Sequence, residues 1–288
     1  MDSRPWARTP GSATRSLTGN PCRASASGPS SAYARLVLRI IDARDGETVD
    51  AAPARRGLTR VEAHVADRGP GALRVLLVAD LVVRTLELGG TPVWSLLTEA
   101  PGQPADRGLP ALRSAAAALG MRPFEDSRDI GLGLGETQVL HVVAQGGATP
   151  DGVRVAVAPV GTDRLPFPDL ARDPAVDPAA VRLALLSPPR ATPLRLDAAV
   201  LGAAHDTLLR WRRAVAGWAA HPSRPVPEEV RVRLRNAWEN DLDVPEVLRV
   251  LAAVETSEGL ADGARFETYA YADRLLGLDL TLGVGAGA

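Results

Sequence analysis

Residues 177–218 read DPAAVRLALLSPPRATPLRLDAAVLGAAHDTLLRWRRAVAGW, and this stretch separates two differently patterned halves of the chain. Asp177 and Pro178 predict the start of a helix, because Asp accepts hydrogen bonds from free amides and Pro suits the first helical position. The run Ser187-Pro188-Pro189 ends that helix, and Asp197 predicts the cap of the next. The apolar positions of this second helix recur at steps of four and three, and they are Val200, Ala204, Leu208, Trp211, Val215 and Trp218.

The half that follows has the same helical pattern. A helix is predicted over 227–240, and Asp243 with the following Pro245 predicts the start of another. A last helix is predicted over 266–276, followed by a flexible tail over 281–288. We therefore expect a helical domain over 177–280, with no strand after residue 180.

The front half alternates strand and helix signals around a glycine-rich loop. This order is typical of a βαβ unit and predicts a parallel sheet, in a reduced Rossmann-like domain over 35–176. We expect an Asp151-Gly152 turn between the last two strands. The predicted strands are 36–41, 61–65, 91–97, 138–144 and 153–157, and the predicted helices are 72–88 and 109–119.

The composition excludes several kinds of chemistry. The chain has 288 residues, a formal net charge of −1 and 45% hydrophobic residues, so a general polyanion-binding surface is not expected. All 33 basic residues are arginines. No step can therefore use a lysine as a phosphate clamp, Schiff base or general base.

Metal, membrane and targeting signals are weak. Cys22 is the single cysteine, and the histidines at 64, 141, 205 and 221 show no ligand spacing, so neither a disulfide nor zinc is expected. No apolar run approaches the roughly 18 residues of a membrane span, which favours a cytoplasmic protein with no membrane contact. Residues 1–33 resemble a transit peptide only superficially, and we expect a disordered extension.

The loop Gly69-Pro70-Gly71 is the first candidate site. It lies between a predicted strand and the helix at 72–88, where backbone N–H groups and the helix dipole can hold a phosphate. The loop matches neither GxGxxG nor a Walker A motif. On the residues alone, a plain tight turn is the favoured interpretation.

Four segments resemble cysteinyl-tRNA synthetase, a class I aminoacyl-tRNA synthetase, and its relative, the cysteine ligase of mycothiol biosynthesis. The most specific is DPAAVRLALLSPPRATPLRLDAAVLGAAHDTLLRW at 177–211, which resembles the family's junction into its helical domain. NDLDVPEVLRVLAAVE at 240–255 resembles part of the C-terminal bundle, and VEAHVADRGPGALRVLLVADLVVRTLELGGTPVW at 61–94 resembles the first βαβ unit. DGVRVAVAPVG at 151–161 lies where the family closes a loop over ATP. The resemblance extends over about 35–280.

The signature motifs of that family are degenerate in this chain. The HIGH-type signature falls on 69–72, where only the glycine matches, and the KMSKS signature falls on 154–158, with Val157 in place of its second lysine. Ala66-Asp67 stands where the resemblance implies a zinc-binding cysteine. The inserted acceptor-end domain and the other zinc ligands are missing, so the chain is truncated relative to the family. These losses predict no catalytic residues, no zinc and no aminoacylation.

Residual nucleotide binding is a separate expectation. The resemblance and the loop geometry nominate five binding residues, with ATP as the weakly supported cofactor: Gly69, Gly71, Arg74, His141 and Arg154. Gly71 keeps a backbone path to a phosphate, and Arg154 replaces a basic residue of the second signature. His141 matches a family histidine beside the nucleotide, although a histidine on a strand is more often simply packed.

Three functions remain open. The first is a pseudoenzyme that binds a nucleotide, an amino acid or a protein partner, or that forms a homodimer because a shortened sheet leaves apolar surface uncovered. The second is an ATP-dependent ligase acting on another acid, with Arg68, Arg74 and Arg154 as phosphate clamps. The third is a tRNA- or synthetase-associating module, although nearby glutamates favour a solvated helix face for its arginines at 210, 212, 213, 231, 233 and 235.

Overall fold

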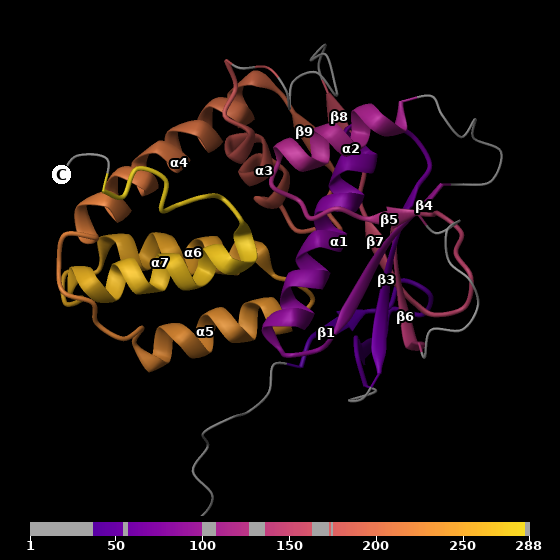
Figure 1. Ribbon diagram of the computed structural model, residues 1–288, viewed down its shortest axis with the longest axis horizontal. Coiled ribbons are helices and arrows are strands. Elements are labelled where there is room, and N and C mark those ends of the chain that lie inside the picture. Colours follow the sequence, from indigo (N-terminus) through magenta and orange to yellow (C-terminus); the bar gives the residue numbers. More distant parts are fainter. Residues whose placement is uncertain are drawn as a thin grey trace, which may run out of the picture. The chain divides into compact units, whose positions relative to one another are not determined.

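A computed structural model of the chain shows a parallel sheet with helices packed against it (Figure 1). The residues that it describes are 37–53, 57–99, 108–126, 136–162, 173 and 175–285. The predicted extension, with Cys22, lies outside these ranges, and so does the end of the predicted tail. Residues Arg35–Ala288 form one compact unit. The domain boundary predicted at residue 176 lies inside this unit and stays a prediction.

The central sheet has five strands in the order β5-β4-β3-β6-β7, and every neighbouring pair is parallel. This confirms the predicted α/β fold class. Chain order reverses at β3, since β4 lies on one side of it and β6 on the other. In open α/β sheets such a reversal marks where ligands bind, beyond the carboxyl ends of the strands. The strands are β3 (Leu58–Val65), β4 (Val93–Glu99), β5 (Glu125–Asp126), β6 (Glu136–Ala144) and β7 (Val153–Val157).

Helix α1 (Pro70–Leu88) covers one face of this sheet (Figure 1). Alternation along β3 decides which side chains meet it. Val61 and Ala63 are fully buried in the core shared with α1. Because successive strand residues point to opposite faces, Glu62 and His64 lie on the face away from α1.

The connection from β6 to β7 is unusually short. Residues 145–152 join two parallel strands, whereas a parallel crossover normally needs a dozen or more residues and a helix. Asp151 and Gly152, predicted as a turn, form a bend, and Gly152 has a φ of 144°, a conformation that other residues rarely adopt. The register pairs Leu140 with Val153, so the segment runs back alongside β6 before β7 begins.

The strand predicted at 36–41 has a different partner from the rest. Only β1 (Arg39–Ile41) is a strand within its described residues, and β1 pairs antiparallel with β2 (Thr48–Asp50) in a separate two-stranded sheet. The Asp45-Gly46 turn signal closes this hairpin, and Gly46 has a φ of 80°. Strand β2 was not predicted from the sequence.

The back half is formed mainly of helices, and its predicted caps are confirmed. The side chains of Asp177, Asp197 and Asp243 accept hydrogen bonds from the amides of the first helical turns. Within the described ranges, no helix is both long and apolar enough to cross a membrane. The helices after α1 are α2 (Leu109–Ala118), α3 (Pro178–Leu186), α4 (Ala198–Trp218), α5 (Glu228–Glu239), α6 (Val244–Thr256) and α7 (Asp262–Leu276).

The expectation of no strand after residue 180 is wrong. Strand β9 (Leu194–Leu196) follows the Pro188-Pro189 break and pairs in parallel with β8 (Val160–Thr162). Helical periodicity cannot exclude a strand of three residues between two helices, because so short a segment has too few positions to show alternation. This pair links the front half directly to the junction.

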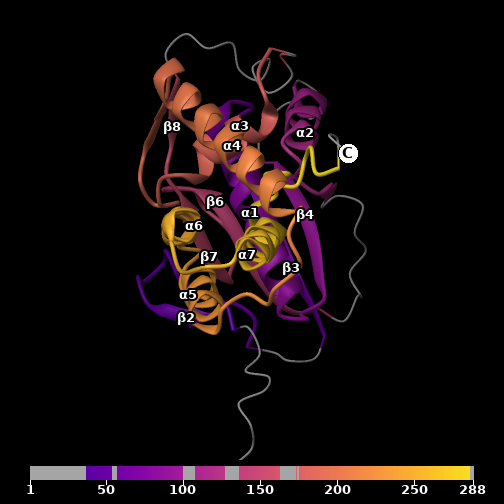
Figure 2. The ribbon, with the colours of Figure 1, turned by 90° about the vertical axis from the view of Figure 1, so that its left-hand side faces the viewer.

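Buried arginines join the two halves. Figure 2, turned so that the helical half faces the viewer, shows α6 and α7 nearly end-on, and α7 contacts α1. The guanidinium of Arg182 on α3 is fully buried and donates to Asp80 Oδ2 (2.7 Å), to the Leu119 carbonyl (2.9 Å) and to the Leu276 carbonyl (2.5 Å). The Arg182 side chain thereby connects α3 with α1, the end of α2 and the end of α7 through hydrogen bonds.

Candidate functional site

A pocket of about 480 Å³ opens at the carboxyl ends of β3, β4 and β6. Its volume lies within the range of roughly 300–1,000 Å³ of small-molecule sites. It lies at the point where chain order reverses and on the sheet face away from α1. Its lining residues are Glu62, His64, Val65, Ala66, Thr98, Glu99, Val143, Ala144, Gly147, Ala148, Thr149 and Pro150.

Three ionisable side chains meet beside this pocket, and two of them, Glu62 and His64, line it. Glu62 and His64 are alternate residues of β3, and His141 is the register partner of Glu62 on β6. His64 Nε2 lies 2.9 Å from His141 Nδ1, and Glu62 Oε2 lies 3.4 Å from His141 Nδ1 and 4.0 Å from His64 Nε2. All three lie at least partly out of solvent, and His141 is 1% exposed.

The surroundings fix the charge of this cluster. Burial alone would raise the pKa of Glu62, but hydrogen bonds with His141 and Thr98 and the charges of His64 and Arg60 outweigh it and lower the pKa to about 2. Burial is also the main reason that the pKa of His64 is lowered. At neutral pH the cluster therefore contains an ionised carboxylate beside a neutral His64 imidazole.

The segment 145–152 packs directly on His141. The Nε2 atom of His141 lies 3.2 Å from the Asp151 carbonyl oxygen. A Cβ atom added to Gly152 would lie 2.9 Å from the His141 ring and 3.2 Å from the Val139 carbonyl. Only a glycine therefore fits against the imidazole here, and the segment both forms the pocket wall and holds the histidine.

In the predicted phosphate-binding loop, the side chain of Asp67 already accepts a hydrogen bond from the backbone. Gly69 is the N-cap of α1, and its N–H donates to Asp67 Oδ1 at 2.7 Å. The other carboxylate oxygen of Asp67 lies 3.9 Å from the point where a Cβ on Gly71 would be. A carboxylate at a helix N-terminus is itself stabilised there and repels a second anion. Asp67 thus disfavours phosphate at the loop.

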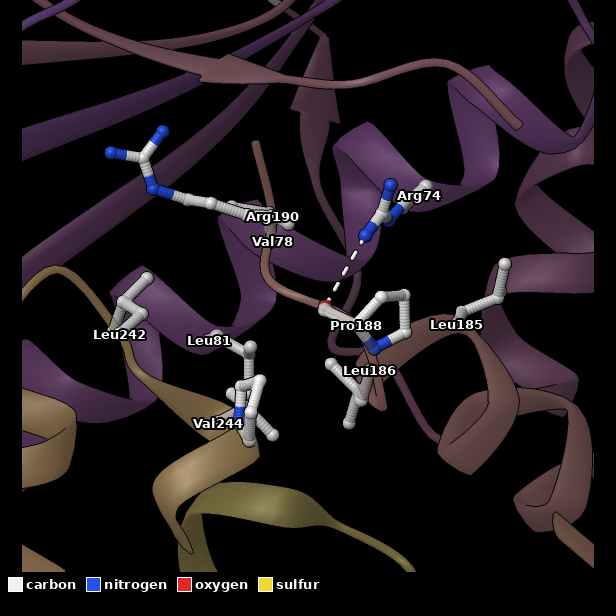
Figure 3. A pocket seen from close by; sticks show the side chains of 10 residues that line it. Arg74, Val78, Leu81, Leu185, Leu186, Pro188, Arg190, Leu242 and Val244 are labelled. Atoms are coloured by element: carbon white, nitrogen blue, oxygen red, sulfur yellow. Dashed lines mark hydrogen bonds between the residues drawn. The ribbon is translucent and has the colours of Figure 1, made fainter. Parts of the chain in front are cut away.

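Arg74 does not line the pocket at the carboxyl ends of the strands. Its side chain is 1% exposed, and it donates to the backbone carbonyls of Ala158, Pro188, Pro189 and Thr192. Figure 3 shows it beside a cavity of only about 10 Å³, with its hydrogen bond to Pro188 dashed. These hydrogen bonds hold the 188–192 segment in place, so the Arg74 side chain has a structural role and is not directed at a ligand.

The other two proposed clamps also have intramolecular partners. The Nε atom of Arg154 donates to Thr149 Oγ1 at 2.9 Å, on the edge of the pocket segment. Arg68 forms an ion pair with Glu99 and donates to the Asp67 carbonyl at 3.0 Å. Of the five predicted binding residues, His141 alone belongs to the cluster with Glu62 and His64.

Sequence reasoning missed Glu62 and His64. The two histidines are 77 positions apart and lie on neighbouring strands, so spacing along the chain could not reveal them. A usable signal was present, because Glu62 and His64 alternate with apolar residues and so share one face of a predicted strand.

Five of the six arginines proposed for tRNA contact form ion pairs with acidic side chains. Arg210 pairs with Glu255, and Arg212 pairs with Asp177 and donates to the Leu278 carbonyl at 2.9 Å. On α5 each proposed arginine has its own glutamate, in the pairs Arg231–Glu228, Arg233–Glu246 and Arg235–Glu239. These pairs support the interpretation of a charge-balanced helix surface.

Comparison with known proteins gives relatives with one shared name, L-cysteine:1D-myo-inositol 2-amino-2-deoxy-alpha-D-glucopyranoside ligase. The relative from Segniliparus rotundus is 35% identical over 121 residues, 41% of this chain and 28% of its own length. The relative from Streptomyces griseus subsp. griseus is 38% identical over 120 residues, 40% of this chain and 28% of its own. The chain thus matches less than a third of either relative's length. No family model matches the chain.

Proposed function

We propose that this relative of the cysteine ligases binds a small molecule bearing an amino group, without activating it through ATP. The observation that carries the proposal is the pocket at the carboxyl edge of the sheet, whose walls include the carboxylates of Glu62 and Glu99. Arg68 pairs with Glu99, and Glu62 stays ionised at neutral pH with the Arg60 Nε atom 3.8 Å from its carboxylate. Such a site favours an ammonium group and disfavours a phosphate. The relatives' name contains L-cysteine, so an amino acid is the first ligand to test.

The loss of ATP chemistry has its own support. Adenylate formation depends mainly on donors that stabilise charge on the transferring phosphate, and removing one such donor typically lowers the rate about 10²–10³-fold. In this chain Asp67 occupies the start of α1, and Arg74 is committed to backbone carbonyls. The position of the second signature lysine is Val157, which is buried. These losses affect separate parts of the reaction, so no single replacement restores it.

The test separates binding from activation. The purified chain is screened by thermal shift and calorimetry against each amino acid, cysteamine, ATP and AMP. We expect at least one amine-bearing compound to raise the melting temperature in a concentration-dependent way, and ATP to have no effect. Binding by ATP with no response to any amine would contradict the proposal.

A matched pair of variants locates the ligand. Ala148 is exposed on the pocket wall, so Ala148→Trp fills the opening without disturbing the core, and we expect it to abolish the shift. Ala252 is exposed on α6 in the helical half, and Ala252→Trp should leave the shift unchanged. Equal effects of both variants would place the ligand elsewhere.

The second candidate is an ATP-dependent ligase with an altered site, which the shared name of the relatives favours. Its signature is amino-acid-dependent exchange of pyrophosphate into ATP, measured beside an active ligase. Exchange above background that falls in Arg154→Gln would replace our proposal with this one. We expect no exchange with cysteine or any other amino acid.

A further inference from the structure

The geometry points to a divalent metal site in which Glu62, His64 and His141 are the protein ligands. None of the three occupies position 66, where the family resemblance expects a metal-binding cysteine. The inference replaces the expectation, made from spacing along the chain, that no metal binds. It goes beyond the proposed function and shares Glu62 with it, so with metal bound an amino group would meet the open position of the metal instead of the Glu62 carboxylate.

The positions of the three donor atoms carry the argument. The edges of the triangle formed by His64 Nε2, His141 Nδ1 and Glu62 Oε2 are 2.9, 3.4 and 4.0 Å. A point equally distant from these atoms lies about 2.0 Å from each, inside the triangle, and zinc binds imidazole nitrogen and carboxylate oxygen at about 2.0–2.2 Å. One small ion can therefore contact all three atoms with little movement of the strands.

The chemistry of the donor set agrees with this geometry. Two histidines and one glutamate form a common triplet of catalytic zinc sites, which leave a further position open for water or a ligand. Glu62 and His64 line the pocket, so the open position faces the 480 Å³ cavity.

A second layer of contacts orients the ligands. The hydroxyl of Thr98 donates to the other oxygen of Glu62, and the Nε2 atom of His141 lies 3.2 Å from the Asp151 carbonyl. A proton on that Nε2 leaves Nδ1 free to bind the metal, which is how carbonyl partners fix the tautomer of metal-binding histidines. The main opposing group is Arg60, whose Nε lies 3.8 Å from Glu62 Oε2. We expect Arg60 to weaken affinity without preventing binding.

The alternative is a cluster without metal, in which the two imidazoles share one proton across the 2.9 Å contact. Zinc titration decides between these two states. The full chain carries Cys22→Ser, so that no thiol competes, and is freed of metal with a chelator. We expect one zinc per chain by calorimetric titration with zinc alone, and a cobalt absorption spectrum typical of four-coordinate geometry.

Substitutions of the metal-binding residues test whether zinc binds at this site. Glu62→Gln and His64→Gln keep side-chain size and should each weaken zinc affinity more than the roughly 10–100-fold that loss of an outer-shell partner gives. His221→Gln removes an exposed histidine and should leave affinity unchanged. Because His141 is buried and its loss could prevent folding, the decision rests on the other two, checked by circular dichroism. A flat titration, or affinity unchanged in both ligand variants, would overturn the inference.

The same samples distinguish this inference from the proposed function. The amine screen is repeated on the metal-free chain and on the zinc-loaded chain. A flat zinc titration beside a thermal shift with an amine overturns the metal site and keeps the pocket function. Zinc binding without a thermal shift with any amine keeps the metal site and overturns the proposed function of the pocket.

Discussion

Replacing Arg182 with leucine tests whether the front and back halves depend on one buried arginine. Arg182 and Asp80 are both fully buried, and the guanidinium also donates to the carbonyls of Leu119 and Leu276. Arg182→Leu leaves those carbonyls and the Asp80 carboxylate without this partner. The packing volume stays nearly constant, so the change reports mainly on the polar contacts.

The expected loss of stability depends on the hydrogen bonds that Asp80 keeps after the substitution. Removing one partner of a buried ion pair typically destabilises a protein by about 3–5 kcal/mol. Here Asp80 still accepts from Arg84 Nε at 2.8 Å and from the Arg122 N–H at 3.2 Å, which favours the lower end. We therefore expect a loss of about 3 kcal/mol in the free energy of unfolding, or a melting temperature lower by about 6–12 °C.

The assay is urea denaturation followed by circular dichroism, with the m-value as the check that unfolding behaviour is unchanged. Arg249→Leu is the matched control, because Arg249 pairs with Glu246 on the exposed side of α6 and its loss should change stability by at most about 0.5 kcal/mol. In a double-mutant cycle with Asp80→Leu, we expect a coupling of at least about 1.5 kcal/mol. A loss below about 1 kcal/mol in Arg182→Leu, or additivity within about 0.5 kcal/mol, would refute the reasoning.

Three further variants probe local features. Burial alone would raise the pKa of Asp42, but hydrogen bonds from Arg44 and from the Arg154 N–H outweigh it and lower the pKa. A carboxylate whose pKa is lowered by folding stabilises the fold fully above its unfolded pKa of about 3.9, and this stabilisation is lost as the pH falls below that value. We expect Asp42→Asn to be less stable than wild type by about 1.5 kcal/mol at pH 7. In denaturation experiments at a series of pH values, this difference should shrink below pH 4. Gly152→Ala puts a Cβ 2.9 Å from the His141 ring at a positive φ, so we expect a loss of about 1–3 kcal/mol together with weaker zinc affinity; unchanged values of both would contradict the packing described here. Gly263→Ala puts a Cβ 1.9 Å from the Pro222 carbonyl oxygen, and we expect a loss of about 2 kcal/mol that does not alter zinc binding, measured by thermal denaturation and titration.

Local signals in the sequence predicted local structure well. Asp177, Asp197 and Asp243 cap their helices as expected, because capping depends only on a side chain and the next few amides. Strand β9 was missed because three residues carry no measurable period, although its main chain pairs with β8. Periodicity reports how a segment is buried, and it does not report which distant segment covers it.

The candidate site was harder to predict for the same reason. His141 was singled out from the family resemblance, but its partners Glu62 and His64 become neighbours only through the strand order around β3. Arg74 follows the glycine-rich loop closely and looked suited to phosphate. Its side chain instead points into the junction, where the carbonyls of the 188–192 segment require donors. Which partner a long arginine finds depends on the tertiary fold.

The short segment 145–152 has a consequence for how relatives of this chain could change their ligand. The chain must return from Ala144 to the level of Leu140, about 13 Å for four strand residues, and eight residues can reach about twice that distance. The surplus forms the pocket wall, while the Gln145 N–H continues the pairing with β7 by donating to Val157. Both ends of the wall are thus clamped in the sheet. Insertions or deletions in the Gly147–Pro150 region would enlarge or shrink the cavity while strand register stays fixed, which makes ligand size a variable that evolution or design can adjust independently of folding.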